Sequence, residues 1–227
     1  MNWKAFIFDM DGTLLDNMAF HIEIWREFLH SLGVQLDEQQ FLQRAVGRVN
    51  SDILRDFVRP DLSDAEIRTL AKQKEALYRS RYRPLMKEVP GLTRLLALAK
   101  QKGVRVALAT SAGVENAHFV LEGLQIQRYF DVLVTGDQVK QGKPHPEIFL
   151  KAAERLDVQS SKCLVFEDSP LGLEAAHRAG MAGIALSTTY PPEQLISLPG
   201  VLAVVPDYTA LLSYNGHLGE FFHSFQN

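Results

Sequence analysis

Residues 5–13, Ala-Phe-Ile-Phe-Asp-Met-Asp-Gly-Thr, give the strongest indication of the fold of this chain. Four consecutive apolar residues that stop abruptly at polar residues are typical of a strand buried on both faces. Asp9 and Asp11 are two residues apart, so in an extended segment both side chains point to the same side. Gly12 permits a sharp turn directly after them. The stretch therefore predicts a buried strand whose carboxyl end presents two acidic side chains.

Five further β-rich runs follow along the chain, and most of them alternate with segments of helical period. They cover residues 104–109, 132–135, 163–166, 183–186 and 201–205. Their apolar residues are mostly continuous rather than alternating, as expected for parallel strands covered by helices on both faces. The alternation of strand and helix from residue 92 to residue 206 predicts an α/β fold with a doubly wound, Rossmann-like parallel sheet.

The segment between the first and second strands differs from the rest, because it contains amphipathic helical windows and no convincing strand. One window covers residues 20–32 and ends at Gly33, and another covers residues 63–83, where Ser63 and Glu66 predict a capping box. A parallel crossover needs only one helix, whereas about 70 residues can form a small domain. We expect an inserted all-helical cap domain at residues 17–87 and a catalytic core made of residues 1–16 and 88–227.

Length, composition and charge exclude several classes of protein. The chain has 227 residues, of which 46% are hydrophobic and 22% are charged, as in globular proteins with a sizeable core. Its formal net charge of −3 supplies no general attraction to nucleic acid or to an anionic membrane. Cys163 is the single cysteine, so no intrachain disulfide can form. We expect a cytoplasmic protein, monomeric or weakly dimeric, with neither a membrane span nor a nucleic-acid partner.

Polar side chains follow four of the predicted strands, at the edge of the sheet where open α/β folds bind their ligands. Each one alone could cap a helix or lie in solvent, but their recurrence at one edge indicates a site. The hydroxyl groups among them can bind phosphoryl oxygens. These residues are Asp9, Asp11 and Thr13 after the first strand, Thr110 and Ser111 after the second, Lys143 after the third, and Glu167 and Asp168 after the fourth.

The four carboxylates of this set predict a cation. Clustered carboxylates repel one another unless a cation joins them, and oxygen ligands suit Mg²⁺, whereas zinc would favour His or Cys. The four acids count −4, and Mg²⁺ with Lys143 counts +3, which leaves −1. This count predicts that Asp11 holds a proton in the empty site and acts as an acid.

The order and spacing of these residues resemble the haloacid dehalogenase superfamily, in its magnesium-dependent phosphatase and phosphomutase branch. Residues 8–14 resemble that family's DxDGT loop, and residues 110–111 resemble its second motif. Residues 142–146 resemble its lysine motif, and residues 167–169 its acidic metal motif. The resemblance extends over about residues 5–206, and the insert resembles the helical cap of the β-phosphoglucomutase-like subgroup.

The resemblance implies a role for each of these residues. Asp9 would be the nucleophile that forms an aspartyl phosphate, while Asp11 would protonate the leaving oxygen and then activate water. Mg²⁺ would be held by the Asp9 carboxylate, the Asp11 backbone carbonyl and Asp168. Glu167 would support these ligands without binding the metal directly. The cap would exclude water and choose the substrate. The residues that would bind the phosphoryl group are Thr110 and Lys143.

Three residues of the insert are candidates for substrate contact. Arg48 suits a second anionic or polyhydroxyl group, but it could equally lie in solvent. β-Phosphoglucomutases carry an arginine nearer the position of Asn50, and valine where this chain has Thr13, and both departures disfavour a mutase. His21 with Trp25 recurs in sugar phosphomutase caps, although the same spacing fits a packing pair on one helix face. The arginines within residues 78–83 indicate a basic helix end rather than a nucleic-acid site.

We therefore expect a magnesium-dependent phosphatase for small phosphorylated metabolites, such as sugar or polyol phosphates, that acts through an aspartyl phosphate. The nearest alternative is a β-phosphoglucomutase-like sugar phosphomutase. A response-regulator receiver, which accepts a phosphoryl group without turnover, gathers similar residues but has no helical insert after its first strand. A true dehalogenase is disfavoured, because its chemistry does not need Asp11.

Overall fold

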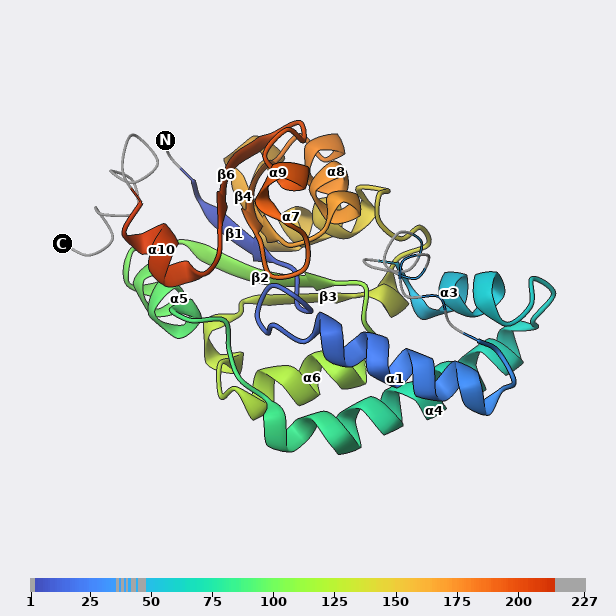
Figure 1. Cartoon of the computed structure of the whole chain (residues 1–227). Helices are drawn as coiled ribbons and strands as arrows, with labels where there is room; N and C mark the ends of the chain where they lie inside the picture. Colours follow the sequence, from blue (N-terminus) through green and yellow to red (C-terminus); the bar gives the residue numbers. More distant parts are fainter. Residues whose placement is uncertain are drawn as a thin grey trace.

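A six-stranded parallel sheet forms the centre of the computed structural model, which describes residues 3–35, 37, 39, 41, 44 and 48–214 (Figure 1). The strand order is β3-β2-β1-β4-β5-β6. Each of the six strands predicted from the sequence is present, with bounds that differ from the prediction by at most one residue. The strands are β1 (Ala5–Phe8), β2 (Arg105–Thr110), β3 (Val132–Thr135), β4 (Cys163–Glu167), β5 (Ala182–Leu186) and β6 (Val201–Val205).

Helices cover both faces of the sheet. Alternate residues of β1 point to opposite sides, and each set is apolar and packs against helices. Phe6 and Phe8 pack with α5 (Leu92–Gln101), α6 (Val114–Gly123) and α10 (Tyr208–Leu212). Ala5 and Ile7 pack with α7 (Glu147–Leu156) and α8 (Pro170–Arg178) on the other face. The doubly wound fold is thereby confirmed. The short elements are α9 (Pro192–Leu195) and the 3-10 helices η1 (Arg83–Leu85), η2 (Gln127–Tyr129), η3 (Gly136–Gln138) and η4 (Ser160–Lys162).

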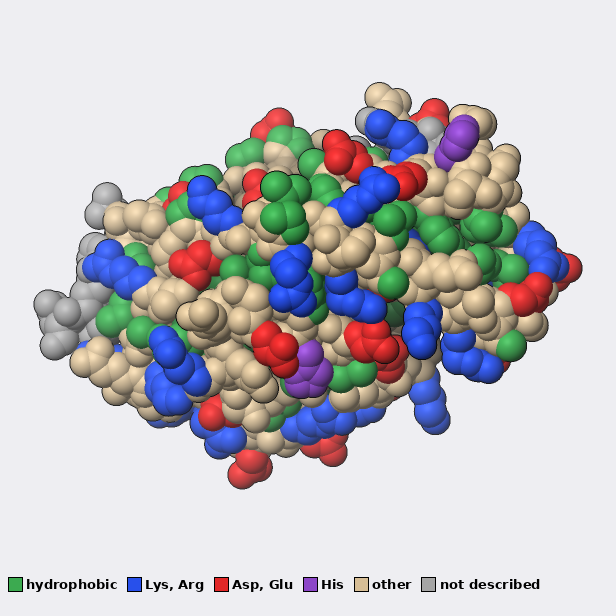
Figure 2. Space-filling model, turned by 90° about the horizontal axis from the view of Figure 1, so that it is seen from below, with side chains coloured by type: hydrophobic (Ala, Val, Ile, Leu, Met, Phe, Trp, Pro, Cys, Tyr) green, Lys and Arg blue, Asp and Glu red, His purple; other side chains and the backbone are tan. Residues whose placement is uncertain are grey.

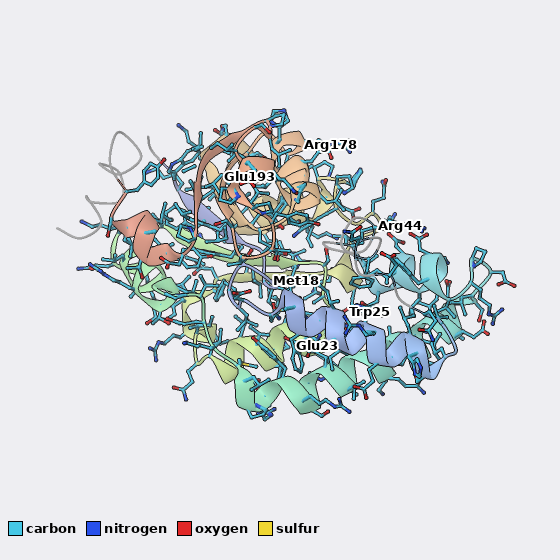
Figure 3. All side chains as sticks on the ribbon, in the orientation of Figure 1. Met18, Glu23, Trp25, Arg44, Arg178 and Glu193 are labelled. Atoms are coloured by element: carbon cyan, nitrogen blue, oxygen red, sulfur yellow. The ribbon has the colours of Figure 1, made fainter. Side chains whose placement is uncertain are left out.

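The insert between β1 and β2 is helical, and its described residues contribute no strand to the sheet. It contains α1 (Met18–Ser31), α3 (Asn50–Phe57) and α4 (Asp64–Tyr82). A separate apolar cluster, which includes Trp25, Phe28 and Leu54, lies between these helices. Figure 3 shows Met18 and Trp25 on α1, on the side of the molecule away from Arg178 and Glu193.

Helix α4 begins at the predicted capping box and links the insert to the sheet. The Ser63 side chain accepts a hydrogen bond from the Glu66 backbone, and the Glu66 carboxylate accepts one from the Ser63 backbone, 2.9 Å away. At the other end of the helix, Tyr78 and Tyr82 belong to the apolar cluster of the sheet. A single helix therefore joins both clusters.

The two connections of the insert lie side by side. Leu15, on the outgoing connection, forms an isolated antiparallel bridge with Glu88 on the returning one. The Val89 backbone donates a hydrogen bond to the Leu14 carbonyl, 2.8 Å away. Both connections between the insert and the sheet consequently pass through one place.

The register of the sheet brings three predicted site segments to one edge. Phe8 is level with Leu108 of β2 and with Phe166 of β4. Because all the strands are parallel, the residues after them emerge at the same edge. The chain also changes direction across the sheet at β1, since β2 and β3 are added on one side of it and β4, β5 and β6 on the other. Open α/β sheets bind their ligands at such a point. No described helix combines the length and the hydropathy that crossing a membrane requires.

Candidate active site

Lys143 joins the ends of β1 and β4. Its ammonium nitrogen lies 2.5 Å from Asp9 Oδ1 and 2.7 Å from Glu167 Oε2. All three side chains are buried. Burial opposes the charge of Lys143, but the two carboxylates outweigh this effect and raise its pKa. Lys143 therefore remains a fixed cation beside Asp9 over the whole physiological pH range.

A second feature of this edge is a cluster of three buried acids. Asp9, Glu167 and Asp168 each offer a carboxylate oxygen within 4.8 Å of the other two. Burial, followed by repulsion from Glu167, raises the pKa of Asp9 to about 8. The same two causes raise the pKa of Asp168 well above its usual value. When ionised, the three carboxylates therefore carry more negative charge than the Lys143 ammonium alone can neutralise.

This cluster fits a hard divalent cation. Asp168 Oδ2 is buried and makes no hydrogen bond with any described residue. The backbone of Gly12 has a φ of +79°, and a Cβ atom there would lie 2.1 Å from that oxygen, so only glycine leaves the space open. An all-oxygen donor set with an unpartnered carboxylate oxygen is typical of Mg²⁺ sites.

Asp11 faces away from the acid cluster and toward the insert. Its Oδ1 accepts a hydrogen bond from Asn17 Nδ2, 2.7 Å away, and lies 3.2 Å from His21 Nε2. Lys74 Nζ lies 3.2 Å from the other ring nitrogen of His21, and an ammonium group can only donate. His21 therefore directs a protonated Nε2 toward Asp11.

This arrangement contradicts the predicted protonation of Asp11. Burial disfavours the carboxylate, but His21 and the Asn17 amide outweigh burial and lower the pKa of Asp11. The pKa of Asp9 is raised instead. The charge count was wrong because it treated the four acids as equivalent, whereas His21 and Asn17 contact only one of them.

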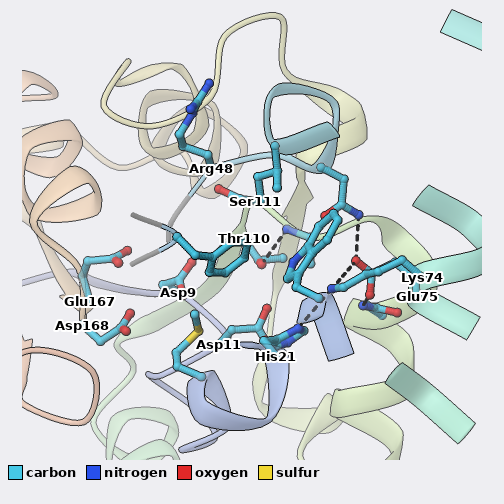
Figure 4. A pocket seen from close by; sticks show the side chains of 17 residues that line it. Asp9, Asp11, His21, Arg48, Lys74, Glu75, Thr110, Ser111, Glu167 and Asp168 are labelled. Atoms are coloured by element: carbon cyan, nitrogen blue, oxygen red, sulfur yellow. Dashed lines mark hydrogen bonds and ion pairs between the residues drawn. The ribbon is translucent and has the colours of Figure 1, made fainter. Parts of the chain in front are cut away.

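A cavity opens between the acid cluster and the insert, and most of the predicted site residues line it (Figure 4). Lys143 and Thr13 are the exceptions, and Thr13 is buried beneath the site. Its hydroxyl group lies 3.5 Å from Asp168 Oδ1, and its carbonyl accepts a hydrogen bond from the Tyr208 hydroxyl. The predicted residues that line the cavity are Asp9, Asp11, His21, Arg48, Asn50, Thr110, Ser111, Glu167 and Asp168.

His21 and Trp25 both line the cavity, but each packs mainly against other residues. The His21 ring stacks on Tyr78 with a centroid distance of 4.1 Å. Trp25 packs against Phe28 and Phe41. The two predictions for this pair are therefore compatible, since the residues are packed within the insert and exposed to the cavity.

Arg48 and the basic end of α4 are engaged in ion pairs. Arg48 lies 2.6 Å from Asp56. Arg79 bonds to Glu115, and Arg81 bonds to Glu27. Figure 2 shows acidic and basic side chains interspersed on the face seen from below. Each of these three arginines is therefore paired with a carboxylate.

Sequence reasoning missed three polar residues of the cavity wall, namely Lys74, Glu75 and Asn116. Adjacent Lys and Glu residues on a helix usually lie in solvent, so their presence in the sequence does not predict a binding site. One signal was available: Ile67, Lys74 and Tyr78 are spaced by seven and four residues. A lysine on the apolar face of a helix indicates a buried ammonium that needs a partner.

The fold and the acid cluster define a hydrolase of the haloacid dehalogenase type. The family of haloacid dehalogenase-like hydrolases matches residues 6–186, and the chain belongs to this family. It is 40% identical over 186 residues to the phosphorylated carbohydrates phosphatase of Thermotoga maritima, covering 80% of this chain and 83% of the relative. It is 34% identical over 184 residues to a fructose-1-phosphate phosphatase of Escherichia coli, covering 80% of this chain and 95% of that relative.

The solved structures point to the same family. The crystal structure of β-phosphoglucomutase from Clostridium difficile superposes with a TM-score of 0.83 and 26% identity. The match covers 99% of each chain. Family membership excludes the receiver module as an interpretation of the strand-end residues.

Proposed function

We propose that this chain is a magnesium-dependent phosphatase that hydrolyses small phosphorylated sugars or polyols through an aspartyl phosphate on Asp9. The position of Asp9 supports this most directly. Its carboxylate contacts the Lys143 ammonium, belongs to the acid cluster and lines the cavity. The names of the relatives, two of which are phosphatases acting on phosphorylated carbohydrates, agree with this chemistry.

Lys143 and the acid cluster would prepare Asp9 to attack phosphorus. Asp9, Asp168 and the Asp11 carbonyl would hold Mg²⁺, with Glu167 oriented by Lys143 and Ser169. When bound, the cation would neutralise negative charge on the acids and on the phosphoryl oxygens. Thr110 and Lys143 would bind the phosphoryl group. Because transfer of a phosphoryl group needs mainly positioning and charge neutralisation, buried and fixed partners suit it.

Asp11 would carry the proton in both half-reactions. As Asp9 attacks, the bond between phosphorus and the ester oxygen breaks, and Asp11 gives that oxygen its proton. Asp11 then takes a proton from water, which attacks the aspartyl phosphate and releases inorganic phosphate. An anionic phosphoryl group beside Asp11 raises its pKa, so the proton would be taken up as substrate binds. His21 and Asn17 would keep Asp11 ionised until then.

We also propose that residues 17–87 form a cap domain that moves against a core made of residues 1–16 and 88–227. The separate apolar cluster of α1, α3 and α4 and the adjacent connections at Leu15 and Glu88 support this division. Such a cap would exclude water while Asp9 is phosphorylated. We expect the protein to act in the cytoplasm as a monomer or weak dimer, which sedimentation analysis would test.

The test is magnesium-dependent release of inorganic phosphate from a panel of sugar and polyol phosphates. We expect turnover by the wild type and none by Asp9→Asn, which removes a charge at nearly constant shape. Retention of activity by this variant would contradict the nucleophile assignment. Circular dichroism of both proteins controls for loss of the fold.

A sugar phosphomutase is the second candidate, because the β-phosphoglucomutase structure matches almost the whole chain. A mutase would convert β-glucose 1-phosphate to glucose 6-phosphate in the presence of a bisphosphate primer and release little phosphate. Measuring both products in one assay separates the two functions.

A further inference from the structure

The cavity wall opposite the acid cluster is built around Glu75. Figure 4 shows Glu75 and Lys74 across the cavity from Glu167 and Asp168. Glu75 belongs to α4, and its side chain is 14% exposed. Under the proposed function, the phosphoryl group reacts at Asp9, so the remainder of the ester extends toward this wall.

Three donors fix the Glu75 carboxylate. Oε1 accepts hydrogen bonds from Asn50 Nδ2 at 2.7 Å and from Lys74 Nζ at 3.0 Å. Oε2 accepts one from Asn116 Nδ2 at 2.5 Å. Burial disfavours its charge, but Lys74, His21 and Asn50 outweigh burial and lower the pKa of Glu75. The wall therefore presents a rigid, ionised carboxylate to the cavity, with the Lys74 ammonium bound to it.

The two cations among the described lining residues are already paired with carboxylates. Lys74 contacts Glu75 at 3.0 Å. Arg48 lies 2.6 Å from Asp56 and 3.6 Å from Asp52. Neither cation is free to receive an anionic group of a substrate, because such a group would have to displace a carboxylate that belongs to the protein.

We propose that Glu75 restricts the substrates to phosphate esters whose leaving group carries no second negative charge. The inference rests on the proposed function and narrows its substrate class to monophosphates of neutral sugars and polyols. The Glu75 carboxylate has a lone pair left to accept a hydrogen bond from a substrate hydroxyl group. A second phosphate or carboxylate would be repelled across a poorly solvated space.

A longer leaving group meets the same charge. A groove of about 720 Å³ adjoins the cavity, and both are lined by Asn50, Glu75, Ser111 and Asn116. Any extension of the substrate from the cavity into the groove passes Glu75. Among the cations that line the groove, Arg55 and Arg79 are paired with Asp64 and Glu115. The others are exposed, so solvent and salt screen them more than Glu75; they are Arg68, Lys72 and Lys140.

The experiment compares substrates that differ in the group remote from the phosphate, which is neutral in one member of each pair and anionic in the other. Sorbitol 6-phosphate is paired with 6-phosphogluconate, and fructose 1-phosphate with fructose 1,6-bisphosphate. The value of kcat/KM for the charged member is divided by that for the neutral one. We expect a ratio below about 0.1 in the wild type, and a rise of at least about tenfold in Glu75→Gln, which frees Lys74.

The matched control is Glu115→Gln, which removes the charge of a carboxylate that lines the groove but is 63% exposed. Its ratio should stay within about twofold of the wild type, since exposed charges are screened. A wild type that accepts both members equally overturns the inference without use of any variant. A folded Glu75→Gln protein with an unchanged ratio overturns it too. Failure of the wild type on every neutral ester instead refutes the proposed function itself.

Discussion

The raised pKa of Asp9 predicts that Asp9→Asn changes how stability depends on pH in the metal-free protein. The pKa of this carboxyl rises from 3.8 to about 8 on folding. A carboxyl group whose pKa is higher in the folded state stabilises the fold when protonated. That stabilisation is complete below about pH 3.8 and is lost as the pH rises through about 8.

The magnitude follows from linkage. When only the folded state holds a proton, the free energy of unfolding falls by about 1.4 kcal/mol per pH unit. The wild type therefore loses about 3 kcal/mol of stability between pH 5 and pH 7. For a protein of this size, that loss lowers Tm by roughly 6–12 °C. The amide introduced by Asp9→Asn has no such proton, so the variant lacks this contribution to the slope. Its broken contact with Lys143 lowers stability, and loss of the Asp9 charge removes one cause of the raised pKa of Asp168, which flattens the curve further.

The assay is urea unfolding at several pH values between 5 and 8 in the presence of a chelator. Wild type and Asp9→Asn are compared with Asp61→Asn, whose side chain is 75% exposed. The control should follow the wild-type curve. Parallel curves for the wild type and Asp9→Asn would refute the reasoning, because they would show that Asp9 ionises normally in the folded protein.

Three further outcomes are expected. Lys143→Met should reduce phosphate release at least about 100-fold, because it leaves Asp9 without its cation; a smaller loss would argue against an electrostatic role. Gly172→Ala should lower the free energy of unfolding by about 1–3 kcal/mol, since its Cβ would lie 2.0 Å from Glu167 Cδ, and a rise in stability would contradict this. Burial raises the pKa of Cys163 to about 11, so a thiol reagent at pH 8 should label the folded protein far more slowly than the urea-unfolded chain. Equal labelling rates would exclude a buried thiol.

Most of the fold could be predicted, because its strands are short apolar runs with abrupt ends. Strand β4 begins at Cys163 and ends at Glu167, one residue beyond the prediction. The capping box at Ser63 fixed the start of α4, since only local geometry is involved. Helix α1 was predicted from residue 20 but begins at Met18, because no capping side chain marks its start.

The candidate site was predictable wherever the sheet alone sets the position. Asp9 and Glu167 lie together because β1 and β4 are adjacent and in register. The environment of Asp11 was not predictable in this way. It depends on Lys74, which lies far along the chain on α4 and reaches Asp11 through His21. Contacts between an inserted helix and a strand end follow from tertiary packing, which no local pattern encodes.

The central place of β1 in the sheet has a consequence for synthesis on the ribosome. Residues 5–8 are made early, but their neighbours are residues 105–108 on one side and 163–166 on the other. At roughly 5–20 residues per second, about 8–30 seconds separate the first strand from its second neighbour. During that interval an apolar strand has unpaired edges and can aggregate. The helices of residues 17–87 emerge first, so among the described elements they are the ones available to shield the nascent strand before α5 and β2 are made.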